Sequence, residues 1–164
     1  MPQLFGLPLH PAVVHFPIAG SVFAAVALAV AGGLTATGRA EASAPWRRAG
    51  LLLLLVALLA TPVTIWSGRG LAISLDDMNE GSLLPKRTAE EGVLYKHALS
   101  AGATAVALLA ASILAYASRS TRKPVLPAAA AALLAAVLMS YTGHLGGTMV
   151  FKPAGPPAEA DPAK

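Results

Sequence analysis

The chain contains no cysteine, and charged side chains make up only 12% of its 164 residues. The lack of cysteine excludes disulfides, cysteine-ligated iron–sulfur clusters, thiolate zinc sites and cysteine nucleophiles. Soluble domains usually carry about 25% charged residues, whereas 55% of this chain is hydrophobic and its mean hydropathy is +0.64. We therefore expect lipid, and not water, to surround most of the chain.

Two further absences narrow the functional classes. The net charge is +4, but no run of Lys and Arg is interleaved with aromatic residues, so nucleic acid is not an expected partner. The sequence also lacks a Ser/His/Asp arrangement, a phosphate-binding loop and an HExxH motif, which gives no support to a hydrolase or a nucleotide-dependent enzyme. We expect no independent catalysis, while a role as a redox subunit stays open.

Long apolar segments are what the sequence contains instead. A helix of about 20 apolar residues crosses a hydrocarbon core of about 30 Å. We predict four such spans, at residues 12–33, 49–67, 95–117 and 125–143. The expected fold class is all-α, a transmembrane four-helix bundle formed by one domain at residues 1–151. The proline-rich end, residues 152–164, is predicted to be a disordered tail.

The distribution of cations predicts the orientation of the bundle. The two short loops, between spans one and two and between spans three and four, carry clustered cations: Arg39, Arg47, Arg48, Arg119, Arg122 and Lys123. The opposite side spreads its cations over a much longer sequence that also holds most of the acids. Because cations in short loops mark the cytoplasmic side, we expect a multi-pass protein of the bacterial inner membrane. Both termini would then face the periplasm or the cell exterior.

All four histidines map to this predicted outer end. His10 and His15 flank the start of the first span, His97 lies at the start of the third, and His144 lies at the end of the fourth. Neutral imidazole binds haem iron, copper and zinc, and helical bundles build such sites from facing helices. A histidine at a helix end is also commonly an interfacial group that bonds a carbonyl or water. Both interpretations of the cluster stay open.

Within the cofactor interpretation, His15 and His97 are the predicted axial ligands of haem iron, because they come from different helices at similar depth. His144 ranks next. His10 ranks last, since it precedes Pro11 and stands five residues before His15, which is not the i,i+4 spacing that places two ligands on one helical face.

The segment GHLGG supplies small neighbours for such a cofactor at Gly143, Gly146 and Gly147. These glycines are compatible with a close approach of the backbone to a ligand. They are equally compatible with a helix C-terminus at which glycine adopts a left-handed conformation.

Three segments resemble a widespread bacterial family of four-span predicted membrane proteins, catalogued as a domain of unknown function. They are HPAVVHFPIA at 10–19, His97 at the head of the third span, and GHLGGTMVF at 143–151. In this family the domain occurs alone or joined to Rieske iron–sulfur or cytochrome c domains, which implies membrane electron transfer and a b-haem anchor. The family's histidines correspond to His10, His15, His97 and His144.

The residues and the resemblance together predict a membrane-embedded electron-transfer protein or subunit that binds haem b near the periplasmic face. Expected partners are the lipid bilayer, quinol, and a periplasmic electron carrier or other redox subunits. Two alternatives stay open. One is a non-redox structural or assembly subunit of the membrane, and the other is a membrane protein that binds copper or zinc through its histidines.

Overall fold

The computed structural model describes residues 3–4, 7–74, 82, 84 and 92–150. Four long helices dominate this part of the chain: α2 (His15–Ala36), α3 (Ala44–Ser74), α4 (Gly92–Ala117) and α5 (Leu126–Val150). A five-residue helix, α1 (Leu9–Val13), precedes α2, and the 3-10 turn η1 (Glu41–Ser43) leads into α3. Four helical segments are long and apolar enough to cross a membrane, which confirms the predicted fold class.

The observed helices extend beyond the predicted spans. Helix α3 extends beyond the predicted second span, residues 49–67, at both ends, and α5 continues beyond the predicted end of the fourth span, residue 143, to Val150. Before the bundle, β1 (Gln3–Leu4) and β2 (Leu7–Pro8) form a short antiparallel pair that the sequence did not predict. The predicted tail at 152–164 lies outside the described residues.

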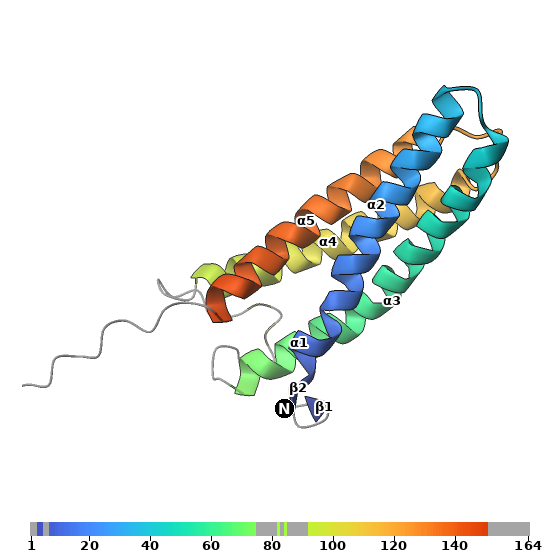
Figure 1. Cartoon of the computed structure of the whole chain (residues 1–164). Helices are drawn as coiled ribbons and strands as arrows, with labels where there is room; N and C mark the ends of the chain where they lie inside the picture. The colour runs from blue at the N-terminus through green and yellow to red at the C-terminus, as the bar shows by residue number, and fades with distance from the viewer. Residues whose placement is uncertain (1–2, 5–6, 75–81, 83, 85–91, 151–164) are drawn as a thin grey trace, which may run out of the picture.

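The helices are antiparallel neighbours arranged as two hairpins. Helix α2 packs along α3, and α4 packs along α5; the bundle is closed by contacts of α2 with α5 and of α3 with α4. In Figure 1 the two hairpins lie close together at the end that holds the α2–α3 connection and diverge toward the end that holds α1. We call the latter the α1 end; the C-terminal ends of α3 and α5 and the start of α4 also lie there.

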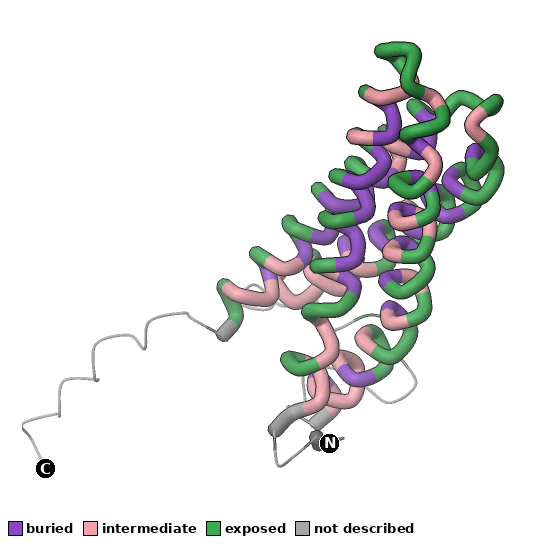
Figure 2. Tube along the Cα trace, turned by 45° about the vertical axis from the view of Figure 1, so that its right-hand side comes forward, coloured by how far each residue is buried: buried purple, intermediate pink, exposed green. Residues whose placement is uncertain are grey.

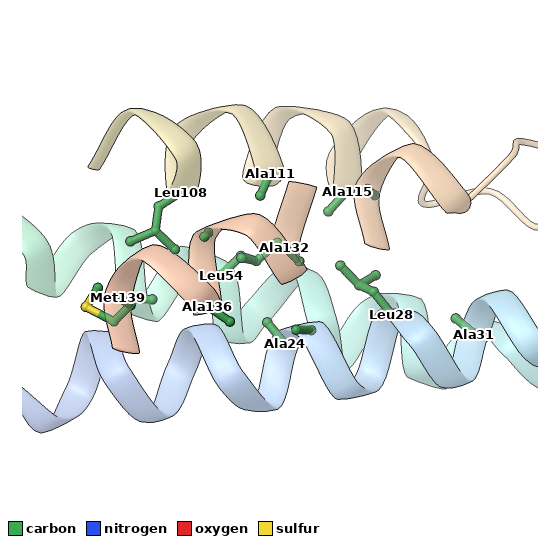
Figure 3. Close-up of a cluster of buried hydrophobic side chains, with 14 of the residues drawn as sticks. Ala24, Leu28, Ala31, Leu54, Leu108, Ala111, Ala115, Ala132, Ala136 and Met139 are labelled. Atoms are coloured by element: carbon green, nitrogen blue, oxygen red, sulfur yellow. The ribbon is translucent and has the colours of Figure 1, made fainter. Parts of the chain in front are cut away.

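Alanine makes up most of the core. The buried cluster in Figure 3 joins Ala24, Leu28 and Ala31 of α2 to residues of the other three helices, including Leu54, Leu108, Ala111, Ala132 and Met139. Small side chains let helix backbones approach closely, which allows van der Waals packing to hold helices together in lipid. Meanwhile many large apolar side chains, such as Leu59 and Val106, point outward and are more than two-thirds exposed, as expected for a surface that faces acyl chains.

Glycine permits the closest contacts between α2 and α3. A β-carbon placed on Gly50 would lie 2.6 Å from Cγ of Leu28, and one placed on Gly20 would lie 3.0 Å from Cβ of Ala57. Real β-carbons do not approach heavy atoms to 2.6 Å, so any larger residue at Gly50 must displace Leu28. These contacts fix the separation and the register of the first hairpin.

A buried arginine closes the other end of the bundle. Arg47, near the start of α3, is 1% exposed. Its guanidinium donates hydrogen bonds to the carbonyls of Ser118 (2.7 Å), Lys123 (2.9 Å) and Ser120 (3.2 Å) in the α4–α5 connection. It also donates to the hydroxyls of Ser43 and Thr35, at 3.0 Å each. Arg47 was predicted only as a loop cation, whereas it ties both short connections together.

Burial changes along the bundle (Figure 2). Buried positions recur along the helices between the short connections and the middle of the bundle, whereas partly buried positions prevail at the α1 end. Several of the buried residues toward the α1 end are polar, among them Ser67, Ser100, Thr104 and Thr142. The α1 end is therefore both less tightly packed and richer in buried hydroxyl groups.

Candidate functional site

The histidines occupy two different environments at the α1 end. His10 on α1 and His97 on α4 are partly buried, whereas His15 on α2 and His144 on α5 are exposed. The imidazole of His15 bonds through Nδ1 to the carbonyl of Pro11, one turn earlier in its own chain, at 2.9 Å. The two partly buried rings therefore define the candidate site.

His10 is held by helix α3. Its Nδ1 lies 3.0 Å from the carbonyl oxygen of Thr64 and 3.3 Å from Oγ of Ser67. A carbonyl oxygen only accepts hydrogen bonds, so the proton of the neutral ring resides on Nδ1. The hydroxyl of Ser67 also donates to the Thr64 carbonyl, at 3.0 Å. As a result, Nε2 of His10 keeps its lone pair available to a ligand.

His97 is held in the same way by helix α5. Its Nδ1 donates to the carbonyl oxygen of Thr142 at 2.9 Å, which again leaves the lone pair on Nε2. The hydroxyl of Thr142 donates to Oγ of Ser100 at 2.9 Å, and Oγ1 of Thr104 lies 3.4 Å from it. These buried hydroxyls link α4 to α5 directly below His97 and fix the register that brings its ring to the Thr142 carbonyl.

The rings of His10 and His97 lie near each other at the α1 end, in an edge-on arrangement. The ring centroids of His10 and His97 are 6.4 Å apart, and the ring planes are inclined at 81°. Two imidazoles that bind one metal ion from opposite sides, each at about 2 Å, place their centroids about 6.3 Å apart. The observed centroid separation is close to this value. Ligating histidines also characteristically donate their second ring nitrogen to a carbonyl, as both rings do here.

The structure pairs the predicted histidine ligands differently from the sequence prediction. The structure brings His97 together with His10, which the sequence ranked last, and not with His15. His10 reaches α3 because it lies on the separate helix α1, and α1 packs against α3. The signal that sequence reasoning missed is the pair of segments TIWSG (64–68) and TGHLG (142–146). Each places a threonine carbonyl one helical turn before a glycine.

The glycines of GHLGG lie within α5, because the helix continues to Val150. The alternative of a left-handed helix terminus at this segment is therefore wrong; among the described residues only Gly38 has a positive φ. A β-carbon on Gly146 would lie 3.3 Å from Cε1 of His97, so this glycine does permit a close approach. One on Gly143 would meet only Ile18, and one on Gly147 would have no neighbour within 4 Å.

The donor set limits the metal chemistry. Within residues 7–74 and 92–150, no group of three or more His, Cys, Asp or Glu side chains is placed to hold a metal ion. A structural zinc site uses four protein ligands and a catalytic one three, whereas the porphyrin of haem supplies four nitrogens and requires only two axial ligands from the protein. Two imidazoles with free Nε2 atoms fit haem better than a bare zinc ion.

Four antiparallel membrane-spanning helices with a histidine pair at one end define this protein as a small helical membrane protein. The chain belongs to the family described as predicted membrane protein (DUF2231), whose model matches residues 6–154. This match confirms the resemblance found from the sequence motifs. Neither the curated proteins nor the solved structures include a match to the chain.

Proposed function

We propose that the protein is a membrane electron-transfer protein that binds one haem b between His10 and His97. The observation that carries this proposal is the pair of rings 6.4 Å apart, each with Nδ1 bonded to a carbonyl of the adjacent helix. A haem with two axial histidines accepts and releases one electron and leaves no open position for substrate. The role is therefore electron transfer and not catalysis on the iron.

The surroundings of the rings support this proposal. Holding the proton on Nδ1 prepares both imidazoles as ligands before any metal arrives, because the neutral ring then offers Nε2 alone. The two histidines belong to different hairpins, and the hairpins diverge at this end of the bundle (Figure 1). The two hairpins therefore present one ligand each, from opposite sides of the site.

A lateral groove supports quinol as the electron donor. It has a volume of about 460 Å³ and lies between α3 and α4, lined by Leu58, Thr61, Pro62, Ile65, Trp66, Arg69 and Ala105. Its lining is almost entirely apolar, and it is open at the side of the bundle, where lipid is expected. Thr61 and Ile65 line the groove and lie on α3 close in sequence to Thr64, whose carbonyl holds His10, so a quinol in the groove would bind to the same helix that positions His10. The electron acceptor would be a periplasmic carrier, in keeping with the orientation predicted from the loop cations.

The test is a reduced-minus-oxidised absorption spectrum of the protein purified after expression with a supply of haem. We expect a b-type α band and a haem content close to one per chain. A purified, folded protein without an α band would overturn the haem proposal. Metal analysis of that same sample would then separate the alternatives, because a copper- or zinc-binding protein retains its ion and a purely structural subunit contains neither.

A further inference from the structure

The two histidines have matching surroundings. The His10 ring donates to the carbonyl of Thr64 and lies against Gly68, four residues later, while the His97 ring donates to the carbonyl of Thr142 and lies against Gly146, also four residues later. A β-carbon on Gly68 would lie 2.8 Å from Cε1 of His10, and one on Gly146 would lie 3.3 Å from Cε1 of His97. In both cases, the threonine carbonyl holds the ring proton on Nδ1, and the Cε1 edge of the ring packs against the glycine.

The match extends along the first helices of the two hairpins. We align α2 with α4 by placing His10 on His97. This alignment carries most of the buried residues of α2 onto buried residues, although Ala27 and Gly32 fall on the exposed Leu114 and Arg119. The matching pairs include Pro17, Ser21, Ala24 and Leu28 on Thr104, Leu108, Ala111 and Ala115.

The second helices match in the same manner. Aligning α3 with α5 by placing Thr64 on Thr142 again carries buried positions onto buried positions: Gly50, Leu54, Ala57 and Thr61 fall on Ala128, Ala132, Ala135 and Met139. Although few residue types are shared, the buried faces of the paired helices largely coincide in these two alignments.

The topology has the corresponding symmetry. Exchanging α2 with α4 and α3 with α5 preserves every major helix contact, because α2–α3 becomes α4–α5 and α2–α5 becomes α3–α4. Both first helices begin at the α1 end, so the relation is a rotation about an axis along the bundle, as in membrane proteins built from parallel repeats. His10 and His97, one from each hairpin, lie near each other at the α1 end.

We propose that the bundle consists of two copies of one helical hairpin and that its site consists of two equivalent half-sites, in which Gly68 and Gly146 are positioning residues. The consequence for binding rests on the function proposed above, namely that a haem is held by both rings. Because it lacks a side chain, each glycine allows its imidazole ring to lie close to the helix that carries the glycine. A methyl group at either glycine pushes that ring toward the opposite ring and strains its bond to the threonine carbonyl.

The half-site segments TIWSG and TGHLG differ at three of their five positions, and one of these differences makes the effects of the two glycines unequal. Ser67 precedes Gly68, and its hydroxyl is a second acceptor for Nδ1 of His10, at 3.3 Å. Leucine occupies the equivalent position, Leu145, before Gly146. The His10 side is also tighter, since its β-carbon distance is 2.8 Å against 3.3 Å for the His97 side. Gly68→Ala should therefore have a larger effect than Gly146→Ala.

The experiment compares Gly68→Ala and Gly146→Ala with the control Gly33→Ala in α2, whose β-carbon has no neighbour within 4 Å. In the full-length protein loaded with haem, we expect both half-site variants to bind haem about 10–100-fold more weakly, as changes around metal-binding histidines commonly do, and to shift the midpoint potential of the haem that remains. Gly33→Ala should match the wild type. Equal haem affinity and potential in all four proteins would overturn the positioning role.

A second measurement needs no haem and separates this proposal from the proposed function. Nitrogen-15 NMR of the haem-free protein labelled at histidine reports which ring nitrogen carries the proton. We expect Nδ1–H rings at His10 and His97 in the wild type, with Gly68→Ala perturbing only His10 and Gly146→Ala only His97. This result in a protein that never acquires an α band would support the two half-sites and reject haem binding. Proton placement on Nε2 in either wild-type ring would overturn the half-sites, even if haem binds.

Discussion

The substitution Arg47→Met should destabilise the bundle substantially, although Arg47 lies far from the histidine pair. The guanidinium makes five hydrogen bonds, three of them to carbonyls of the α4–α5 connection. Methionine fills a similar volume and donates none of them. The size of the effect depends on which acceptors can find another donor.

The three carbonyls differ in whether another hydrogen-bond donor can replace the guanidinium. Ser120 keeps the backbone N–H of Lys123 as a donor at 3.0 Å, and Lys123 is exposed, so water can reach its own carbonyl. Ser118 is buried, with 5% exposure, so its carbonyl loses the guanidinium without replacement by water. An unsatisfied buried acceptor costs about 1–3 kcal/mol, and bonds to charged donors contribute more than neutral ones. Removing a buried charge offsets part of this loss, which leaves about 2 kcal/mol of expected destabilisation.

The assay is reversible unfolding in mixed detergent micelles, followed by circular dichroism, with the free energy of unfolding compared between variants. Arg48→Met is the matched control, because Arg48 is the neighbouring residue and is exposed; we expect its effect to stay within about 0.5 kcal/mol. Arg47→Lys should fall between the two, since an ammonium cannot reproduce the planar fork of donors. An Arg47→Met protein that is no less stable than Arg48→Met would show that the buried guanidinium does not stabilise the bundle.

Three further predictions concern packing and the site. Gly50→Val should lower the free energy of unfolding by about 1–3 kcal/mol, because valine overpacks against Leu28. Gly33→Val is the control, since a β-carbon there has no neighbour within 4 Å, and it should change the free energy by less than half as much. Equal losses in the two variants would contradict the contact between Gly50 and Leu28. Thr142→Val keeps the carbonyl that holds His97 but removes the hydroxyl bond between α4 and α5. It should lower the free energy of unfolding by about 1 kcal/mol in the same assay, while the haem band persists. Loss of the band would contradict the view that this hydroxyl only aligns α4 with α5. Ala105→Trp should fill the lateral groove and slow haem reduction by quinol in stopped-flow measurements without changing the spectrum, and an unchanged rate would remove the groove as the quinol site.

The sequence predicted the bundle because the relevant signal is local. Four apolar segments of sufficient length require four membrane-spanning helices, whatever their packing. The helix ends were less predictable, since α3 begins at Ala44, where Arg47 finds acceptors in another connection, and α5 continues to Val150 through the glycines. Both depend on contacts between distant segments, which hydropathy does not reveal.

The candidate site was predicted only in part. The sequence predicted that the histidines lie at one end of the bundle, because successive spans cross the membrane in opposite directions. The partner of His97 could not be predicted in this way, since it depends on the direction in which each side chain points. The sequence favoured His15 because it comes from a different helix than His97 at a similar depth. In the structure, His10 on the short helix α1 bonds to Thr64 of α3, and His15 is exposed. No periodicity argument gives the angle between α1 and α2. The recurrence of threonine and glycine four residues apart was visible in the sequence, but its meaning required the two rings to be in place.

Haem retention in four histidine variants tests the central claim most directly. Each variant is expressed with a supply of haem, and the haem-to-protein ratio and the α band are measured after purification. We expect His10→Ala and His97→Ala to lose the bis-histidine spectrum, while His15→Ala and His144→Ala retain it at wild-type occupancy. Loss of the band in His15→Ala together with its retention in His10→Ala would contradict the pairing of His10 with His97.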